Sequence, residues 1–352
     1  MKTRITELFG IKHPIVQAPA NFVGLPPVVV AASNAGGLGM LATGLMTPDS
    51  ARKDIQTIRE QTDKPFGVNL VAGAPGYEEV ARVLVEERVP IIAHARGHID
   101  WLIPETKARG IKVIQTVGAI RHALNAEREG VDALIVQGTE AGGGVGFISS
   151  MVLLPLIAEK VKIPLIAAGG FCDGRGLAAA LALGADGVAM GTRMALSKES
   201  LIPDNVKQRY IEASEADTVV TSAIIGSRLR VLRNPLVDSL EETGQKSLSL
   251  RERISSSMKT RKELGVSWWR FLIGGWRMKK EYGASMTELA SMAAGGMRVP
   301  RALVDGDADY GVMPSGQVCG RINNVLTVRE IIESTVAEAE TIMKMVGEKV
   351  RA

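Results

Sequence analysis

Eight short apolar runs, each about the length of a buried strand, recur through the first 190 residues and alternate with segments of helical period. They cover residues 14–19, 38–43, 65–70, 90–94, 111–116, 132–137, 163–168 and 186–190. Strands that alternate with helices predict βαβ units and a parallel sheet, and eight such units in this length favour a closed barrel over an open doubly wound sheet. We therefore predict an α/β fold of the (β/α)8, or TIM-barrel, class.

The alternation ceases after about residue 220, and the chain that follows differs in composition. Residues 221–311 are basic, rich in Ser and Met, and hold three of the four tryptophans. Within 228–280 we count 13 Lys and Arg against 5 Asp and Glu, although the whole chain carries only +4. We predict a barrel formed by 1–220 and 312–352, with 221–311 as a basic helical cap over its mouth.

Several function classes are disfavoured by what the sequence lacks. No run reaches the ~18–20 uncharged apolar residues of a membrane span, and the N-terminus lacks the apolar core of a signal peptide, which indicates a cytoplasmic protein. Cys172 and Cys319 have no partners at metal-ligand spacing, so neither a disulfide framework nor a metal site is expected. The basic cap favours an anionic small-molecule substrate over its rival, nucleic acid, and a merely solvated face is an equal alternative.

Two of the predicted strands end in glycine-containing turns about twenty residues apart. Gly169 and Gly170 follow the run 163–168, and Gly191 and Thr192 follow the run 186–190. Backbone N–H groups converge on an anion only where no Cβ intervenes, and the last two strand ends of such barrels commonly hold a phosphate. The sequence therefore predicts a phosphate site here, with simple tight turning as the alternative.

The remaining strand ends carry amides, small residues and one histidine. Examples are Gln17 with Ala18, Asn69, His94, and the run from Gln137 to Gly146. No metal-ligand cluster and no Ser-His-Asp set lies among them. A pocket of this kind suits a flat, hydrogen-bonding heterocycle that carries a phosphate. A lyase or binder of phosphorylated ligands is the non-redox alternative, because it would use the same turns.

Several motifs taken together resemble one family. They are Pro14-Ile15-Val16-Gln17-Ala18-Pro19, Phe66-Gly67-Val68-Asn69, Gln137-Gly-Thr-Glu-Ala-Gly-Gly, Ala168-Gly-Gly-Phe-Cys-Asp-Gly-Arg-Gly, Met190-Gly-Thr-Arg and Ser315-Gly316-Gln317. In this order, over nearly the whole chain, they resemble the nitronate monooxygenase (2-nitropropane dioxygenase) family, which also includes NADH:quinone reductases and the FMN-dependent enoyl-acyl-carrier-protein reductase. The resemblance implies FMN as cofactor. A homodimer is common among such relatives.

The resemblance also implies roles for individual residues. Those expected to lie against or to hydrogen-bond the isoalloxazine ring are Ala18, Pro19, Ala20, Asn69, Gln137, Gly142 and Gly143. Those expected around the phosphate are Ala168, Gly169, Gly170, Met190, Gly191 and Thr192, while Gln317 approaches from the C-terminal part. For Gln17, Asn69 and Gln137, capping of the strand ends is the structural alternative.

One position departs from the family pattern. Members usually carry histidine at the end of the Glu-Ala-Gly-Gly-His run, where this chain has Gly144. Oxidation of a neutral nitroalkane needs a base for the α-proton, which glycine cannot supply, whereas reduction of an activated C=C depends less on that residue. His94 is a tentative substitute, and a purely structural histidine is the alternative there.

A second, less specific resemblance concerns the substrate. Arg230-Val-Leu-Arg, Leu303-Val-Asp-Gly and Ser315-Gly-Gln-Val are similar to a family branch linked to unsaturated acyl-CoA intermediates of steroid-ring breakdown. This implies a CoA thioester, whose phosphates the basic residues could hold. We therefore predict an oxidoreductase that uses NADH or NADPH to reduce an α,β-unsaturated acyl-CoA type of substrate. Oxidation of nitronates by O2 and reduction of quinones are the alternatives within the redox class.

Overall fold

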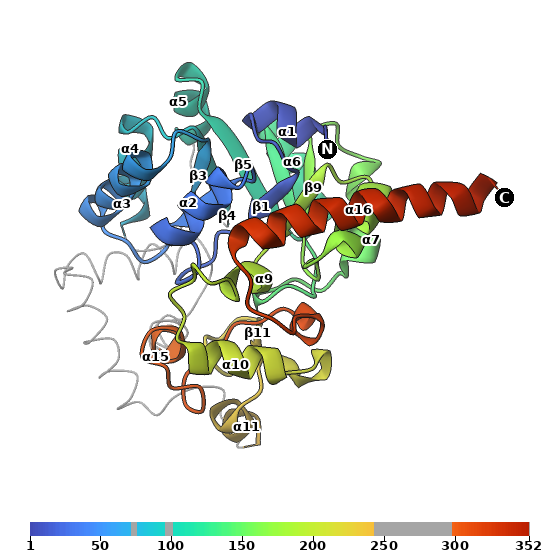
Figure 1. Cartoon of the computed structure of the whole chain (residues 1–352). Helices are drawn as coiled ribbons and strands as arrows, with labels where there is room; N and C mark the ends of the chain where they lie inside the picture. Colours follow the sequence, from blue (N-terminus) through green and yellow to red (C-terminus); the bar gives the residue numbers. More distant parts are fainter. Residues whose placement is uncertain (72–75, 96–100, 243–297, 352) are drawn as a thin grey trace.

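An eight-stranded parallel barrel forms the centre of the computed structural model, which describes residues 1–71, 76–95, 101–242 and 298–351 (Figure 1). Its strands are β1 (Ile15–Gln17), β2 (Gly39–Ala42), β3 (Phe66–Val71), β4 (Ile91–Ala95), β5 (Lys112–Val117), β6 (Ala133–Gln137), β8 (Leu165–Ala168) and β9 (Gly187–Met190). Hydrogen bonds join them in the order β1-β9-β8-β6-β5-β4-β3-β2. The Gln17 N–H donates to the Leu38 carbonyl and the Leu38 N–H to the Ile15 carbonyl, both at 2.9 Å, which closes the ring. The predicted TIM barrel is confirmed.

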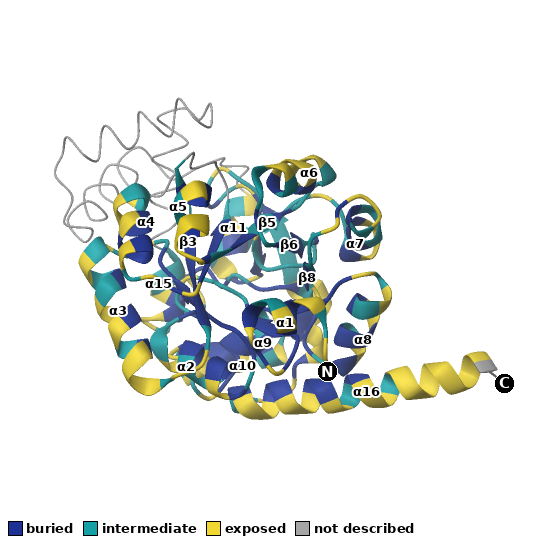
Figure 2. Cartoon of the chain, turned by 90° about the horizontal axis from the view of Figure 1, so that it is seen from above, coloured by how far each residue is buried: buried dark blue, intermediate teal, exposed yellow. Residues whose placement is uncertain are grey.

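Helices surround the barrel and start and stop where local chemistry dictates. They are α2 (Pro26–Asn34), α3 (Pro48–Gln61), α4 (Tyr77–Glu86), α5 (Leu102–Ala108), α6 (Ile120–Glu129), α7 (Ser150–Ala158) and α8 (Gly174–Ala182). Seen from above, their inner faces are buried and their outer faces exposed (Figure 2). The Asp173 carboxylate caps α8 by accepting the Gly176 N–H at 2.9 Å, as the sequence predicts. Helix α2 is apolar from Pro26 to Ala32 and has polar residues only at its end, so no polar face marks it in the sequence.

Large side chains fill the amino-terminal half of the barrel. Met40, Ile91, Ile114 and Ile166 pack there, and α1 (Arg4–Phe9) adds Ile5 and Phe9 to the same cluster. Towards the carboxyl ends, the strand positions on this inner face change to small or polar residues. They are Ala18, Asn69, Ala93, Thr116, Gln137 and Ala168, which we call the mouth layer. The interior is therefore packed at one end and lined by short side chains at the other.

A smaller layer lies against the carboxyl ends of the barrel strands (Figure 1). Its antiparallel sheet has the order β10 (Thr218–Thr221), β11 (Leu229–Leu232) and β7 (Gly143–Gly144). Around it lie α9 (Thr192–Ala195), α10 (Asp204–Glu212), α11 (Pro235–Glu242) and α15 (Arg298–Leu303). The sequence predicts a helical cap over 221–311, but its first described part contains a strand, because Leu229 to Leu232 pair with β10 instead. Residues 243–297, with Trp268, Trp269 and Trp276, lie outside the described residues.

The last helix, α16 (Val328–Arg351), crosses the outside of the barrel and packs against α8 and α2. Its buried face includes Ile332 and Val336, as the apolar stripe predicts, and its far end projects beyond the barrel (Figure 1). Across the described ranges, no helix combines the length and the apolar character needed to cross a bilayer.

Candidate active site

The two glycine turns lie side by side at the carboxyl ends of β8 and β9. These strands are neighbours, with Ala168 opposite Ala189. Gly169 and Gly170 have φ of +99° and +85°, in the left-handed region that side chains disfavour. A Cβ on Gly169 would also come within 3.0 Å of the Gly138 carbonyl oxygen. Glycine is thus required at the first turn by backbone conformation and by packing.

The main chain of these turns offers hydrogen-bond donors. No hydrogen bond joins the N–H groups of Gly170, Gly191 or Thr192 to an acceptor within the described ranges, whereas the Gly169 N–H belongs to the β8–β9 ladder, in which Ala168 pairs with Ala189. A Cβ built on Gly191 would touch only the Ala18 Cβ, at 3.8 Å, so the space in front of this turn is open. Unpaired N–H groups beside open space at two adjacent strand ends fit a bound phosphate.

A loop after β6 is fastened to both turns. The Glu140 carboxylate accepts the Ser150 N–H at 3.0 Å, and the Ser150 Oγ lies 3.0 Å from the Gly169 carbonyl. The Gln317 N–H donates to the Glu140 carbonyl at 3.0 Å, and the Gly316 N–H donates to the Thr192 Oγ1, also at 3.0 Å. Tertiary folding thereby brings the 315–317 segment to the loop and to the second glycine turn. Gln317, from the C-terminal part of the chain, therefore lies beside the loop after β6, and its role toward a ligand stays a prediction.

The three candidate amides have different environments. Asn69 is buried in the mouth layer, and its side-chain amide has no hydrogen-bond partner in the described part of the chain. The Gln137 amide donates to the Gly144 carbonyl at 2.7 Å. Gln17 points away from the interior: its Oε1 accepts the Met40 N–H at 2.8 Å, and its Nε2 donates to the Ala18 carbonyl. Gln17 therefore joins β1 to β2, whereas Asn69 has a free amide to offer a ligand.

The glycine run after Gln137 is held by the smaller sheet. Gly143 lies opposite Arg230 and Gly144 opposite Leu229. A Cβ on Gly142 would come within 2.6 Å of the Ser315 carbonyl carbon, so this run packs against the 315–317 segment without side chains. Gly144, the position at which the resemblance implies histidine, is thus placed by backbone pairing with β11.

His94 and Met190 face away from the barrel interior. His94 is in register with Leu70 and Gln115, and Leu70 belongs to the core between the strands and the outer helices. The sequence expects His94 at the mouth, but the pleat directs it outwards, where it is 2% exposed. The Met190 side chain likewise packs in the outer core, and its carbonyl accepts the Ala18 N–H at 2.9 Å. We carry neither side chain forward as a contact to a ligand.

Around the site, Ala18, Pro19 and Ala20 are half-buried at the end of β1, and Ala168 lines the interior. Behind the first turn, burial raises the pKa of the Cys172 thiol to about 11, so this thiol stays protonated near neutral pH. None of the side chains in the mouth layer carries an ionisable group. The described interior therefore offers amides, backbone and small apolar surfaces, but no acid or base.

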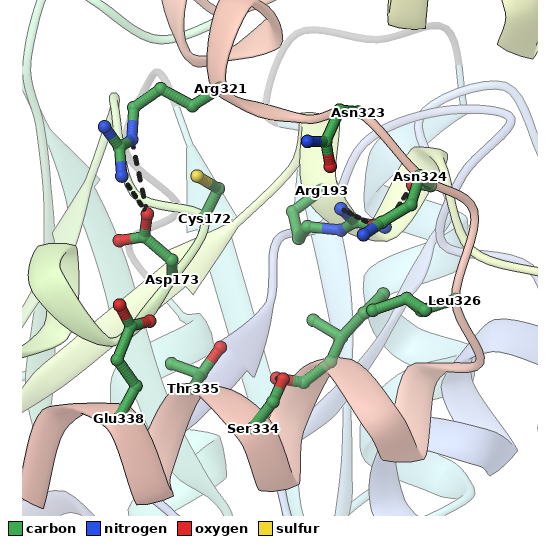
Figure 3. Close-up of a pocket in the computed structure, with 11 residues that line it drawn as sticks. Cys172, Asp173, Arg193, Arg321, Asn323, Asn324, Leu326, Ser334, Thr335 and Glu338 are labelled. Atoms are coloured by element: carbon green, nitrogen blue, oxygen red, sulfur yellow. Dashed lines mark hydrogen bonds and ion pairs between the residues drawn. The ribbon is translucent and has the colours of Figure 1, made fainter. Parts of the chain in front are cut away.

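A cavity of about 160 Å3 lies outside the barrel wall, between α8, α16 and the segment 321–326 (Figure 3). Arg321 pairs with Asp173 on one side of it, and Arg193 donates to the Asn324 carbonyl at 2.8 Å on the other. Burial lowers the pKa of the Arg193 guanidinium. The Arg193 hydrogen bond fastens α9 to the segment 321–326. Because this cavity lies outside the barrel wall and not at the mouth, we do not identify it with the active site.

Arg230 enters the sequence-based predictions only within a motif and as one of the basic residues, which gives it no role beside the glycine run. It is 7% exposed, and its Nε donates to the Thr139 carbonyl at 3.1 Å while Nη1 donates to the Thr218 Oγ1 at 3.0 Å. Burial lowers the pKa of its guanidinium. It forms no ion pair within the described residues. Arg230 therefore clamps the glycine run to the smaller sheet, and only the pairing of β11 with β7 reveals this.

Comparisons with known proteins agree with this geometry. The family model described as nitronate monooxygenase matches residues 2–80 and 71–338. The chain is 40% identical over 340 residues to a protein of Rhodococcus jostii RHA1, covering 96% of each, and 40% identical over 344 residues to one of Mycobacterium tuberculosis H37Rv, covering 97% of each. Both relatives are named (3aS,4S,5R,7aS)-5-hydroxy-7a-methyl-1-oxo-octahydro-1H-indene-4-carboxyl-CoA dehydrogenase. FabK from Thermotoga maritima superposes with a TM-score of 0.80 at 37% identity, over 99% of both chains.

Proposed function

Because this chain belongs to the nitronate monooxygenase family and is therefore a flavin-dependent oxidoreductase, we propose that its flavin is FMN and that NADH or NADPH is its electron donor. The acceptor we propose is an electron-poor C=C of an α,β-unsaturated acyl-CoA type of substrate. The family assignment confirms the predicted redox class and sets aside the non-redox lyase or binder.

The described residues fit FMN at both ends. The N–H groups of Gly170, Gly191 and Thr192 would hold its phosphate, because they have no other acceptor in the described chain, and Gly169 would let the phosphate approach the turn closely because it carries no Cβ. The free amide of Asn69 would hydrogen-bond the polar edge of the ring, with Gln137 beside it and Ala18 to Ala20 against its face. When bound, FMN supplies hydride transfer between a reduced nicotinamide and an electron-poor acceptor.

The observation that carries the choice of reaction is the mouth layer without an ionisable side chain. Oxidation of a neutral nitroalkane requires a base for the α-proton, and Gly144 leaves that position without one. Reduction of a C=C instead requires a hydride at the β-carbon and a proton at the α-carbon, which water can supply. The chain's own residues then need only bind and orient the substrate.

A second candidate is the oxidative direction on a CoA thioester. It is favoured by the names of the two relatives at 40% identity, which are dehydrogenases of a carboxyl-CoA. The same described residues would bind the thioester in either direction, but oxidation also removes its α-proton and therefore requires a base that the mouth layer does not supply.

Anaerobic mixing with NADH and then with NADPH tests this proposal. We expect rapid bleaching of the flavin absorbance by at least one of them, followed by recovery of the absorbance when an α,β-unsaturated acyl-CoA such as crotonyl-CoA is added. Recovery by a saturated acyl-CoA is not expected and serves as the control. No bleaching by either nucleotide, combined with oxygen uptake on addition of a nitronate, would overturn the proposal in favour of a nitronate monooxygenase. Recovery by a quinone alone would identify a quinone reductase.

A cytoplasmic location and a homodimer are also part of the proposal. Gel filtration with light scattering checks the second.

A further inference from the structure

An arginine and an aromatic ring stack on the rim beside Gly144. The Val145 N–H donates to the Arg228 carbonyl at 3.3 Å, which places the start of β11 next to the loop 144–148. The guanidinium carbon of Arg228 lies 4.1 Å from the centre of the Phe147 ring. Phe147 is nevertheless 79% exposed. One face of the ring therefore carries the guanidinium, while much of the remaining ring surface is open to solvent.

Hydrogen-bond donors at this rim are unused. The Arg228 Nε and the Ser227 Oγ are both buried, and neither has a hydrogen-bond partner among the residues described. Arg228 also forms no ion pair with any described carboxylate. Buried donors without acceptors are costly in a native protein, so they point to an acceptor that arrives with a ligand.

A second arginine–aromatic pair in the smaller layer differs from this one in its charge partner. The Arg301 guanidinium carbon lies 5.5 Å from the centre of the Tyr310 ring. There, however, the Arg301 Nη2 pairs with the Asp307 carboxylate at 2.6 Å, and the Arg301 Nε donates to it at 2.7 Å. Arg301 is neutralised within the chain, whereas Arg228 is left for an external anion.

We propose that Ser227, Arg228 and Phe147 form a subsite for the adenosine diphosphate part that CoA and NAD(P)H share. Phosphate oxygens accept hydrogen bonds from the Arg228 guanidinium and the Ser227 hydroxyl, and the adenine stacks on the open side of Phe147. Because the loop beside Gly144 carries the subsite, a ligand anchored here has its reactive end near the barrel mouth. This inference rests on the proposed function for the identity of the ligands.

Calorimetric titration of the FMN-loaded holoenzyme with ADP tests the subsite without turnover. We expect Arg228→Met to weaken ADP binding about tenfold and Phe147→Ala about fivefold. Arg301→Met and Tyr310→Ala are the matched controls, and they should leave ADP binding unchanged. Equal ADP affinity in the wild type and Arg228→Met, or no ADP binding by the wild type, would refute the subsite. Should Arg228→Met fail to fold, Ser227→Ala serves in its place, with an expected loss of about threefold.

Two pairs of substrates then separate the two sources of the nucleotide. If the subsite holds CoA, Arg228→Met raises KM for crotonyl-CoA but not for crotonyl-pantetheine. If it holds the electron donor, the variant raises KM for NADH but not for reduced nicotinamide mononucleotide. If the variant leaves KM unchanged for both crotonyl-CoA and NADH, the subsite is refuted. A wild type that uses neither substrate would refute the proposed function instead, and the ADP titration would still decide the subsite.

Discussion

The phosphate end of the site and the rim beside Gly144 are built by different parts of the chain. At the ends of β8 and β9 the donors that we propose for the phosphate are main-chain N–H groups, those of Gly170, Gly191 and Thr192. At the rim, the side chains of Arg228, which precedes β11, and of Arg230, which lies within it, reach across to the loop after β6. Under the proposed function, backbone N–H groups would hold the phosphate of the cofactor, whereas the arginine side chains at the rim would act on the loop and on the substrate.

The largest effect should come from Gly169→Val, which attacks the backbone end. The valine backbone would have to keep φ of +99°, which L side chains disfavour. Its Cβ would lie about 3 Å from the Gly138 carbonyl oxygen and the Ala141 nitrogen. We expect FMN affinity to fall by about 100-fold or more, measured by recovery of flavin fluorescence on dilution. Gly110→Val is the control, because it also has positive φ, at +70°, but no neighbouring atoms within 4 Å. If Gly169→Val keeps the flavin occupancy of the wild type, the phosphate is not bound at this turn.

Gly191→Ala sharpens the same test, because it should affect the ligand and spare the fold. Gly191 has φ of −96°, and a Cβ there meets only Ala18 at 3.8 Å. The melting temperature of the apoprotein should therefore stay within about 2 °C, whereas FMN affinity should fall about tenfold as the methyl group enters the phosphate space. A loss of apoprotein stability without loss of FMN affinity would mean that the open space is not the phosphate site.

Arg230→Met addresses the rim. It removes the buried clamp between Thr139 and Thr218, so we expect the glycine run to loosen and kcat/KM for the acyl-CoA to fall about fivefold to tenfold. FMN affinity should change less than threefold, because the phosphate turns lie elsewhere. Arg230→Lys, which restores the charge and one donor, should recover part of the activity. Loss of FMN equal to that in Gly169→Val would show that the two regions are not separable.

The smallest effect on the cofactor is expected from Gly144→His. Gly144 is exposed and is held by backbone pairing with Leu229, so a side chain there can point to solvent or to the mouth. Flavin occupancy should stay within about twofold of the wild type, checked by the absorbance of the purified protein. The histidine supplies the missing base, and a gain of oxygen uptake with a neutral nitroalkane is the expected new activity. Loss of flavin would show that this loop borders the ring more closely than we infer.

The sequence predicted most of the barrel and part of the site. All eight strands lie within two residues of their predicted ranges, because each is a short apolar run set between helices with recognisable ends such as Asp173 and Gly130. The glycine turns could also be predicted from the sequence, because their backbone geometry requires glycine. The strands β10 and β11 could not be predicted. Each has four residues, and β11 also pairs with the distant two-residue strand β7, so the local sequence pattern is weak.

The sequence by itself determined the order of strands and helices, the two glycine turns and the family motifs that imply a flavin. Only the tertiary structure decided which way each strand residue faces, so that Asn69 enters the mouth while Gln17, His94 and Met190 do not. The physical reason is that parallel strands in a barrel are buried on both faces, so their sequences are apolar throughout and do not mark the inner side. Likewise, the meeting of Arg228 and Arg230 with the loop near Gly144 depends on a pairing between distant segments, which no local pattern encodes.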